Sequence, residues 1–180
     1  KLQKIGFVNK DTNAFNQLID GKIESVTSRG NVIRVKLDNG TNVILSPEYG
    51  GRVTYHESEK TVPQRLHLRL DFDDGTFLAV KLAGMGVIHA LRNGELEKSY
   101  VYRRDFSDVL SPSDTREFTF DRFSDMLAER KEIMKSLLVG KDAVVVGVGN
   151  SAYQDIICRA KIHPKRKASE LSENEKLALY

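Results

Sequence analysis

Cysteine is almost absent from this chain, and long apolar runs are absent altogether. One cysteine, Cys158, stands among 180 residues, which excludes a disulfide framework and a zinc site built from several cysteines. Cys158 lies beside Ile156 and Ile157 in a segment with helical spacing, so we expect it to pack in a core. No run approaches the ~18 apolar residues of a membrane-spanning helix, and residues 1–4 do not form a signal peptide. We therefore expect a soluble intracellular protein with no membrane partner.

An excess of one charge is lacking as well. The 28 Lys and Arg residues against 25 Asp and Glu give a formal net charge of +3, which says little about partners. The distribution is uneven, because Arg159 to Lys167 contains five basic residues, one His and no acid. Such a run can contact several DNA phosphates with a steep salt dependence. A solvated helix end is the more frequent explanation of a charge run, and both alternatives stay open at this point.

The first part of the chain has the two-residue period of β-strands. Ile33, Val35 and Leu37 alternate with polar residues and run into Asn39-Gly40, which is typical of a hairpin turn. Several short strands with tight turns between them indicate an antiparallel sandwich or a barrel. The expected strands cover residues 33–37, 43–45, 66–72, 76–82 and 87–91.

After Leu110 the apolar period becomes helical. Residues 133–138 repeat Ile and Leu at helical spacing, and Gly140 can end that helix. Ser172 with Glu175 has the spacing of a capping box for a last helix that starts at Glu173. The sequence therefore predicts an α+β protein: a β-rich, sandwich- or barrel-like domain in residues 1–100 and a helical domain in residues 111–180. A linker is expected near residues 99–113.

A glycine-rich turn, Gly147-Val148-Gly149-Asn150, precedes a helix whose apolar stripe includes Tyr153 and Ile157. A helix N-terminus offers unpaired N–H groups and the positive end of a dipole, so it suits a phosphate. Asn150 stands at the expected cap position, and its amide can also donate to a phosphate oxygen. The alternative is a purely structural cap. After this helix, Lys165 and Arg166 are candidate phosphate contacts, with a solvated turn as the alternative.

Taken together, these segments resemble the bacterial formamidopyrimidine-DNA glycosylase and endonuclease VIII family. The resemblance is strongest over residues 137–177, which look like that family's helix–two-turn–helix element. It is carried there by Val146–Asn150, Asp155–Ile157, Ala160–Arg166 and Ala168–Ser172. The β part is similar through its strand and turn order and through Arg29-Gly30, Gly50-Gly51, His67 and Gly86.

The resemblance implies a role in DNA repair. Enzymes of the family flip an oxidised base out of the duplex, attack its glycosidic carbon with an N-terminal proline amine, and use a neighbouring glutamate as acid and base. This chain begins Lys1-Leu2-Gln3, so the resemblance implies a Pro-Glu start with a helix and a strand upstream. It also implies a zinc finger beyond Tyr180. We therefore expect no catalytic residue and no cofactor within this chain.

The resemblance also implies which positions face DNA. Tyr49 and Met85 fall near the family's two wedge residues, although ordinary loop packing is an alternative for Tyr49. Asn31 stands at the family's catalytic lysine, and Ala83-Gly84 stand near its paired arginines, so these cations are missing. The expected DNA contacts are Arg29, Asn31, His67, Gly149, Asn150, Lys165 and Arg166, with an ordinary surface histidine as the alternative for His67. Near a hairpin, Asp71, Asp73 and Asp74 indicate turn chemistry rather than a metal site.

Three functions follow as hypotheses. The intact protein is a DNA glycosylase with abasic-site (β-elimination) lyase activity, or it is a non-catalytic relative that binds damaged or abasic DNA. Asn31 and Ala83-Gly84 favour the second. An RNA-associated module is a weaker third, because no strand carries an aromatic stacking platform. We expect damaged or abasic duplex DNA as the partner, a monomer, and a cytoplasmic, nucleoid-associated location in a bacterium.

Overall fold

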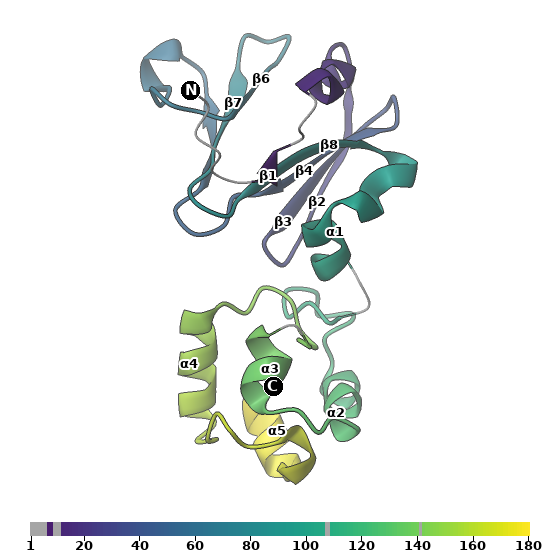
Figure 1. Ribbon diagram of the computed structural model, residues 1–180, viewed down its shortest axis with the longest axis vertical. Coiled ribbons are helices and arrows are strands. Elements are labelled where there is room, and N and C mark those ends of the chain that lie inside the picture. Colours follow the sequence, from purple (N-terminus) through teal and green to yellow (C-terminus); the bar gives the residue numbers. More distant parts are fainter. Residues whose placement is uncertain (1–6, 9–11, 107–108, 141) are drawn as a thin grey trace. The chain divides into compact units, whose positions relative to one another are not determined.

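The computed structural model describes residues 7–8, 12–106, 109–140 and 142–180. The chain divides into two compact units, Lys1–Arg103 and Arg104–Tyr180. Strands dominate the first unit and helices the second (Figure 1). The division falls inside the segment 99–113, which also holds the short helix α1 (Tyr100–Asp105). The fold is therefore α+β, as the change of period along the sequence predicts.

The first unit contains two sheets with the strand orders β1-β8-β4-β3-β2 and β5-β7-β6. Within them, β1 pairs with β8 in parallel and the other pairings are antiparallel. The strands are β1 (Phe7–Val8), β2 (Ile23–Arg29), β3 (Val32–Leu37), β4 (Thr41–Ser46), β5 (Arg52–His56), β6 (Leu68–Asp71), β7 (Phe77–Lys81) and β8 (Val87–Arg92). The 3-10 helices η1 (Thr12–Leu18), η2 (Glu59–Thr61) and η3 (Asn93–Lys98) connect them.

One face of each sheet contributes to a shared apolar core. Val35, Val43 and Ile88 come from the five-stranded sheet, and Val80 comes from the three-stranded sheet. Alternation along the strands explains this, since every second side chain points to the same face. All six residues of β4 are buried, because β4 is a central strand with both faces covered. Sequence patterns thus located the sandwich and most of its strands, but not β1, β2 or β5.

The described residues of the second unit form four α-helices and one 3-10 helix, which pack around a core of their own. These are α2 (Phe120–Ala128), α3 (Met134–Val139), α4 (Asn150–Arg159), η4 (Ala168–Glu170) and α5 (Glu173–Leu179). Phe123, Leu137 and Tyr153 lie in that core. No helix of the described residues is long and apolar enough to cross a bilayer.

Two helix boundaries match the sequence, and one packing prediction is wrong. Gly140 is the C-cap of α3. Ser172 and Glu175 form the predicted capping box at α5, with Ser172 N donating to Glu175 Oε2 at 2.8 Å. That backbone hydrogen bond holds the pKa of Glu175 below its usual value. Cys158, however, is exposed rather than packed, because the buried stripe of α4 runs through Tyr153 and Ile157 and the next position turns toward solvent.

Candidate nucleic-acid interface

The start of α4 is fixed by a short buried segment in front of it. Val144 and Val146 are buried and pair with the backbone of Leu110. Leu110 N donates to Val144 O at 2.9 Å, and Val146 N donates to Leu110 O at 2.8 Å. Gly147 then adopts a φ of 81°, a left-handed conformation that glycine reaches without strain. This anchored segment and the glycine turn determine where α4 begins.

The N-terminus of α4 presents hydrogen-bond donors that the helix does not use. Gly149 is the N-cap and makes no side-chain cap hydrogen bond. Tyr153 N donates to Gly149 O at 2.9 Å, which is the first bond of the helix, so the N–H groups of residues 150–152 have no helical partner. Asn150 is the first helical residue and not the cap. Its exposed amide has no hydrogen-bond partner within the described part of the chain.

Gly149 is not required by the packing of this chain. Its φ of −85° and ψ of 170° suit any residue, and a Cβ placed on it would meet nothing within 4 Å. Gly140 behaves differently, since a Cβ there would lie 2.8 Å from Ser136 Cα. Because packing within the chain does not require a glycine at position 149, its bare backbone leaves room for a ligand to approach closely. The N–H groups of residues 150–152, the Asn150 amide and the bare Gly149 backbone together are the kind of donor set that anions bind in other proteins.

The basic run after α4 is partly engaged within the protein. Arg159 pairs with Asp155 at 2.8 Å. Arg166 Nη1 lies 3.3 Å from Glu175 Oε1, and its Nη2 donates to the Glu170 carbonyl at 2.6 Å. Arg166 must therefore exchange internal partners before it can contact a phosphate. Lys165 is exposed, and its ammonium has no partner among the residues that the structure describes, which makes it the more available of the two predicted contacts.

In the first unit, Arg29 and Asn31 lie at the turn between β2 and β3. Gly30 has a φ of 56° and Asn31 is exposed at the tip. Arg29 is half-buried and lies opposite Val32. The asparagine amide carries no charge, so this turn places a hydrogen-bonding group, and not a cation, at the position where the sequence resemblance expects a lysine.

Tyr49 and Met85 lie on two loops that contact each other. Tyr49 is 98% exposed in the β4–β5 loop, and Met85 is 69% exposed in the β7–β8 loop. A Cβ on Gly50 would lie 3.2 Å from Ala83 Cβ, and one on Gly86 would lie 2.9 Å from the Pro47 carbonyl oxygen. The structure thus brings the two predicted wedge loops together at one end of the first unit. We call them the wedge loops, residues 47–51 and 83–86.

His67 lies directly before β6. It is hydrogen-bonded to residues 80 and 82, just before the second wedge loop. Its backbone N–H donates to Val80 O at 2.8 Å, and its ring Nδ1 accepts from the backbone N–H of Leu82 at 3.0 Å. Because Nδ1 is an acceptor, the ring proton sits on Nε2. The half-buried ring is therefore oriented by backbone, with Nε2 as the atom that remains for a ligand.

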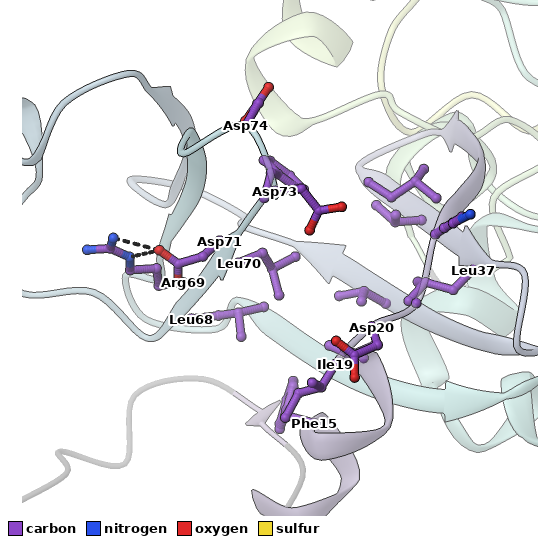
Figure 2. Close-up of a pocket in the computed structure, with 17 residues that line it drawn as sticks. Phe15, Ile19, Asp20, Leu37, Leu68, Arg69, Leu70, Asp71, Asp73 and Asp74 are labelled. Atoms are coloured by element: carbon purple, nitrogen blue, oxygen red, sulfur yellow. Dashed lines mark hydrogen bonds and ion pairs between the residues drawn. The ribbon is translucent and has the colours of Figure 1, made fainter.

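A separate cavity of about 940 Å³ opens between η1, β2 and β6. Figure 2 shows Phe15, Leu37 and Leu68 among its apolar lining, and none of the residues predicted to face DNA lines it. The acidic residues beside it serve the local structure. Asp71 pairs with Arg69 at 2.6 Å, and Asp74 accepts from the Thr76 hydroxyl and N–H at 2.6 and 2.9 Å, which lowers the Asp74 pKa. Within the described ranges, no three His, Cys, Asp or Glu side chains gather as metal ligands.

Burial shifts the pKa of two groups, the half-buried His89 and the buried Tyr153. Burial lowers the pKa of His89, and burial raises the pKa of the Tyr153 phenol. The imidazole is thus neutral and offers no cation, and the phenol keeps its proton.

Two cations beside the wedge loops were missed by the sequence reasoning. Arg52 in β5 and Lys81 in β7 lie directly opposite each other. Since β6 lies between β5 and β7 in the sequence but not in the sheet, no turn signal could set their register. The sequence offered one signal: Arg52 directly follows Gly50-Gly51, and Lys81 lies just before Ala83.

The chain is similar to a family of DNA-repair proteins. Residues 110–180 match the formamidopyrimidine-DNA glycosylase H2TH domain. The formamidopyrimidine-DNA glycosylase of Bacillus cereus is 27% identical over 172 residues, which cover 94% of this chain and 60% of the relative. That of a Roseiflexus species is 30% identical over 156 residues, which cover 84% of this chain and 54% of the relative. The chain thus spans a little over half the length of these relatives.

The fold is also that of solved structures. A crystal structure of Lactococcus lactis formamidopyrimidine-DNA glycosylase, non-covalently bound to DNA with an abasic site, aligns with a TM-score of 0.70 at 18% identity. The alignment covers 88% of this chain and 58% of that one. The inhibited Lactococcus lactis enzyme in complex with DNA that contains N7-benzyl-Fapy-dG aligns with a TM-score of 0.73, also at 18% identity, over 91% of this chain and 59% of that one.

Proposed function

We propose that this chain, as a member of the formamidopyrimidine-DNA glycosylase family, binds duplex DNA through the N-terminus of α4. The observation that carries the proposal is the set of donors at this helix end: the N–H groups of residues 150–152, the Asn150 amide and the bare Gly149 backbone. A phosphate bound there gains hydrogen bonds and the favourable end of the helix dipole. Such a contact positions a duplex without reading its sequence.

We propose that damaged or abasic duplex is preferred, because the wedge loops can fill a gap in the base stack. Tyr49 and Met85 are exposed apolar side chains on loops that touch, and apolar wedges of this kind enter base steps that are easily unstacked. Unstacking is least costly where a base is damaged or missing. The protein acts as a monomer, with the α4 site holding the backbone and the wedge loops entering the stack.

For the intact protein, we propose base-excision repair by glycosylase and β-elimination lyase activity. The attacking amine is a proline supplied outside the described residues, and this chain holds and opens the DNA for it. The imine chemistry needs an amine nucleophile and an acid–base group, and neither role is assigned to a residue of this chain. In the part of the chain that is described, no three His, Cys, Asp or Glu side chains gather as metal ligands, and the one cysteine lies exposed on α4.

A non-catalytic DNA-damage binder is the second candidate. It is favoured by the uncharged Asn31 at the β2–β3 turn and by Ala83-Gly84 in the second wedge loop. Borohydride trapping of the full-length protein on abasic DNA separates the two. A covalent adduct requires an imine and supports the lyase, whereas tight binding without an adduct supports the binder.

Substitution of Tyr49 by alanine is expected to remove the preference for abasic duplex. Base–aromatic stacking contributes about 1–3 kcal/mol, so affinity for a duplex with one abasic-site analogue should fall by roughly 5- to 150-fold. Affinity for the intact duplex should change little, because the phosphate contacts remain. Fluorescence anisotropy with the two duplexes at one salt concentration measures the ratio.

Tyr55→Ala is the matched control, since Tyr55 is also exposed but lies within β5 rather than on a wedge loop. This variant should keep the wild-type ratio. Equal affinity of the wild-type chain for both duplexes, or an unchanged ratio in Tyr49→Ala, would contradict the wedge role.

A further inference from the structure

A row of basic side chains crosses the three-stranded sheet next to the wedge loops. Arg52 in β5 lies opposite Lys81 in β7, and opposite residues of neighbouring strands project from the same face about 5 Å apart. Both side chains are exposed. His67 comes directly before β6, and its backbone N–H donates to Val80 O at 2.8 Å, so it is not part of this pair. Two cations thus share one face of the sheet.

The Arg52 and Lys81 charges are not compensated within the described residues. Like charges directly opposite each other destabilise a sheet, and neither side chain has an acidic partner in the part of the chain that is described. Some other cations of this unit are paired: Arg69 lies 2.6 Å from both Glu59 and Asp71, and Lys36 lies 2.8 Å from Glu24. Within its described part, the fold thus places two unpaired cations opposite each other on neighbouring strands.

That place adjoins the wedge loops. Arg52 directly follows Gly50-Gly51, and Lys81 is two residues before Ala83. Gly50 and Ala83 lie against each other, so the two cations stand at the bases of the loops that expose Tyr49 and Met85. An anion bound between the cations would neutralise the repulsion.

We propose that Arg52 and Lys81 together bind one phosphodiester of the DNA backbone beside the base step that the wedge loops enter. The guanidinium supplies a planar fork of donors and the ammonium a compact charge, and both are common phosphate ligands. The inference rests on the proposed function, because it assigns a second backbone contact to the same DNA. It also supplies positive charge next to Ala83-Gly84, where that loop has none.

The test is the salt dependence of duplex binding by the full chain, with Arg52→Gln, Lys81→Gln and the double variant. Each neutralised phosphate contributes about 0.9 to the slope of log K against log salt. The double variant should lower the slope by about 0.9 and weaken binding about tenfold, equally for intact and abasic duplexes. Each single variant should lose nearly as much as the double, because one phosphate is shared. A fall of about 1.8 in the double variant would indicate two separate phosphates and overturn the shared site.

Lys81→Glu is a further test, because it should change thermal stability and DNA affinity in opposite directions. Glutamate opposite Arg52 forms a cross-strand ion pair, so the thermal midpoint should rise while DNA affinity falls below that of Lys81→Gln. A lower midpoint with unchanged affinity would show that the pair is structural and would overturn the inference. Lys60→Gln is the control, because Lys60 is an exposed cation of the same unit on η2, away from the wedge loops in sequence, and it should keep the wild-type slope.

The two proposals fail differently. If the wild-type chain does not bind duplex DNA, the proposed function fails. If the wild-type chain binds with a steep slope and the double variant keeps that slope, only the Arg52–Lys81 site is wrong.

Discussion

Replacement of Asn150 by aspartate is expected to weaken duplex binding by roughly 10- to 150-fold without lowering thermal stability. The loss corresponds to one hydrogen bond to a charged group, about 1.5–3 kcal/mol, and a carboxylate next to a phosphate adds repulsion. Stability should hold, because the Asn150 side chain makes no hydrogen bond within the described structure and an acidic residue in the first turn favours the helix dipole. Duplex titrations and thermal melts of the same samples measure both quantities.

Gln154→Glu is the matched control for that variant. It makes the same amide-to-acid change at an exposed position one turn further along α4, where no free N–H group points at a ligand. Affinity should fall much less. If Asn150→Asp binds as the wild type does, or if it loses stability in proportion to affinity, Asn150 is not a phosphate ligand.

Gly51→Ala is expected to cost about 1–3 kcal/mol in the free energy of unfolding, the range of overpacked substitutions. A Cβ there would lie 2.6 Å from the Pro47 carbonyl carbon and still closer to its oxygen. The obstacle is backbone, so the loop itself must move, and Tyr49 moves with it. Denaturant unfolding should show the loss, and the preference for abasic duplex should fall in the same variant.

The same substitution at Gly149 should have a different profile. A Cβ there meets nothing within 4 Å. Alanine at a compatible φ gains about 0.4–1 kcal/mol through the unfolded state, but it is a poorer N-cap than glycine, so stability should stay close to that of the wild type. DNA affinity should nevertheless fall, because the methyl group stands where a phosphate approaches the helix. A loss of stability in Gly149→Ala, or wild-type affinity, would show that this glycine has no binding role.

Parts of the fold could be predicted where the local pattern carries the information. The alternation in β3, the turn Asn39-Gly40 and the apolar run at residues 43–45 locate a hairpin without tertiary context. β2 could not be found in this way, because six of its seven residues are exposed and no buried face imposes a period. The apolar stripe of α4 could be predicted from helical spacing. Its exact edge could not, because Ile157 is buried and the next residue, Cys158, is exposed.

The same contrast holds for the interface. The donors at Gly149 and Asn150 follow from a glycine turn and the apolar stripe behind it, both local signals. The Arg52–Lys81 pair depends on the strand order β5-β7-β6, which no local signal determines. Similarly, the basic run gave no sign that Arg166 pairs with Glu175, nine residues further along, because that contact depends on where α5 packs.

The central claim is that a DNA phosphate binds at the N-terminus of α4. Amide chemical-shift mapping of the full chain, titrated with a short duplex that contains an abasic-site analogue, tests it most directly. We predict that the backbone amides of residues 149–152 and the Asn150 side-chain amide shift most in the second unit, and that Asn150→Asp abolishes these shifts. Unchanged amides at residues 149–152 at saturating duplex, with shifts concentrated elsewhere, would contradict the account.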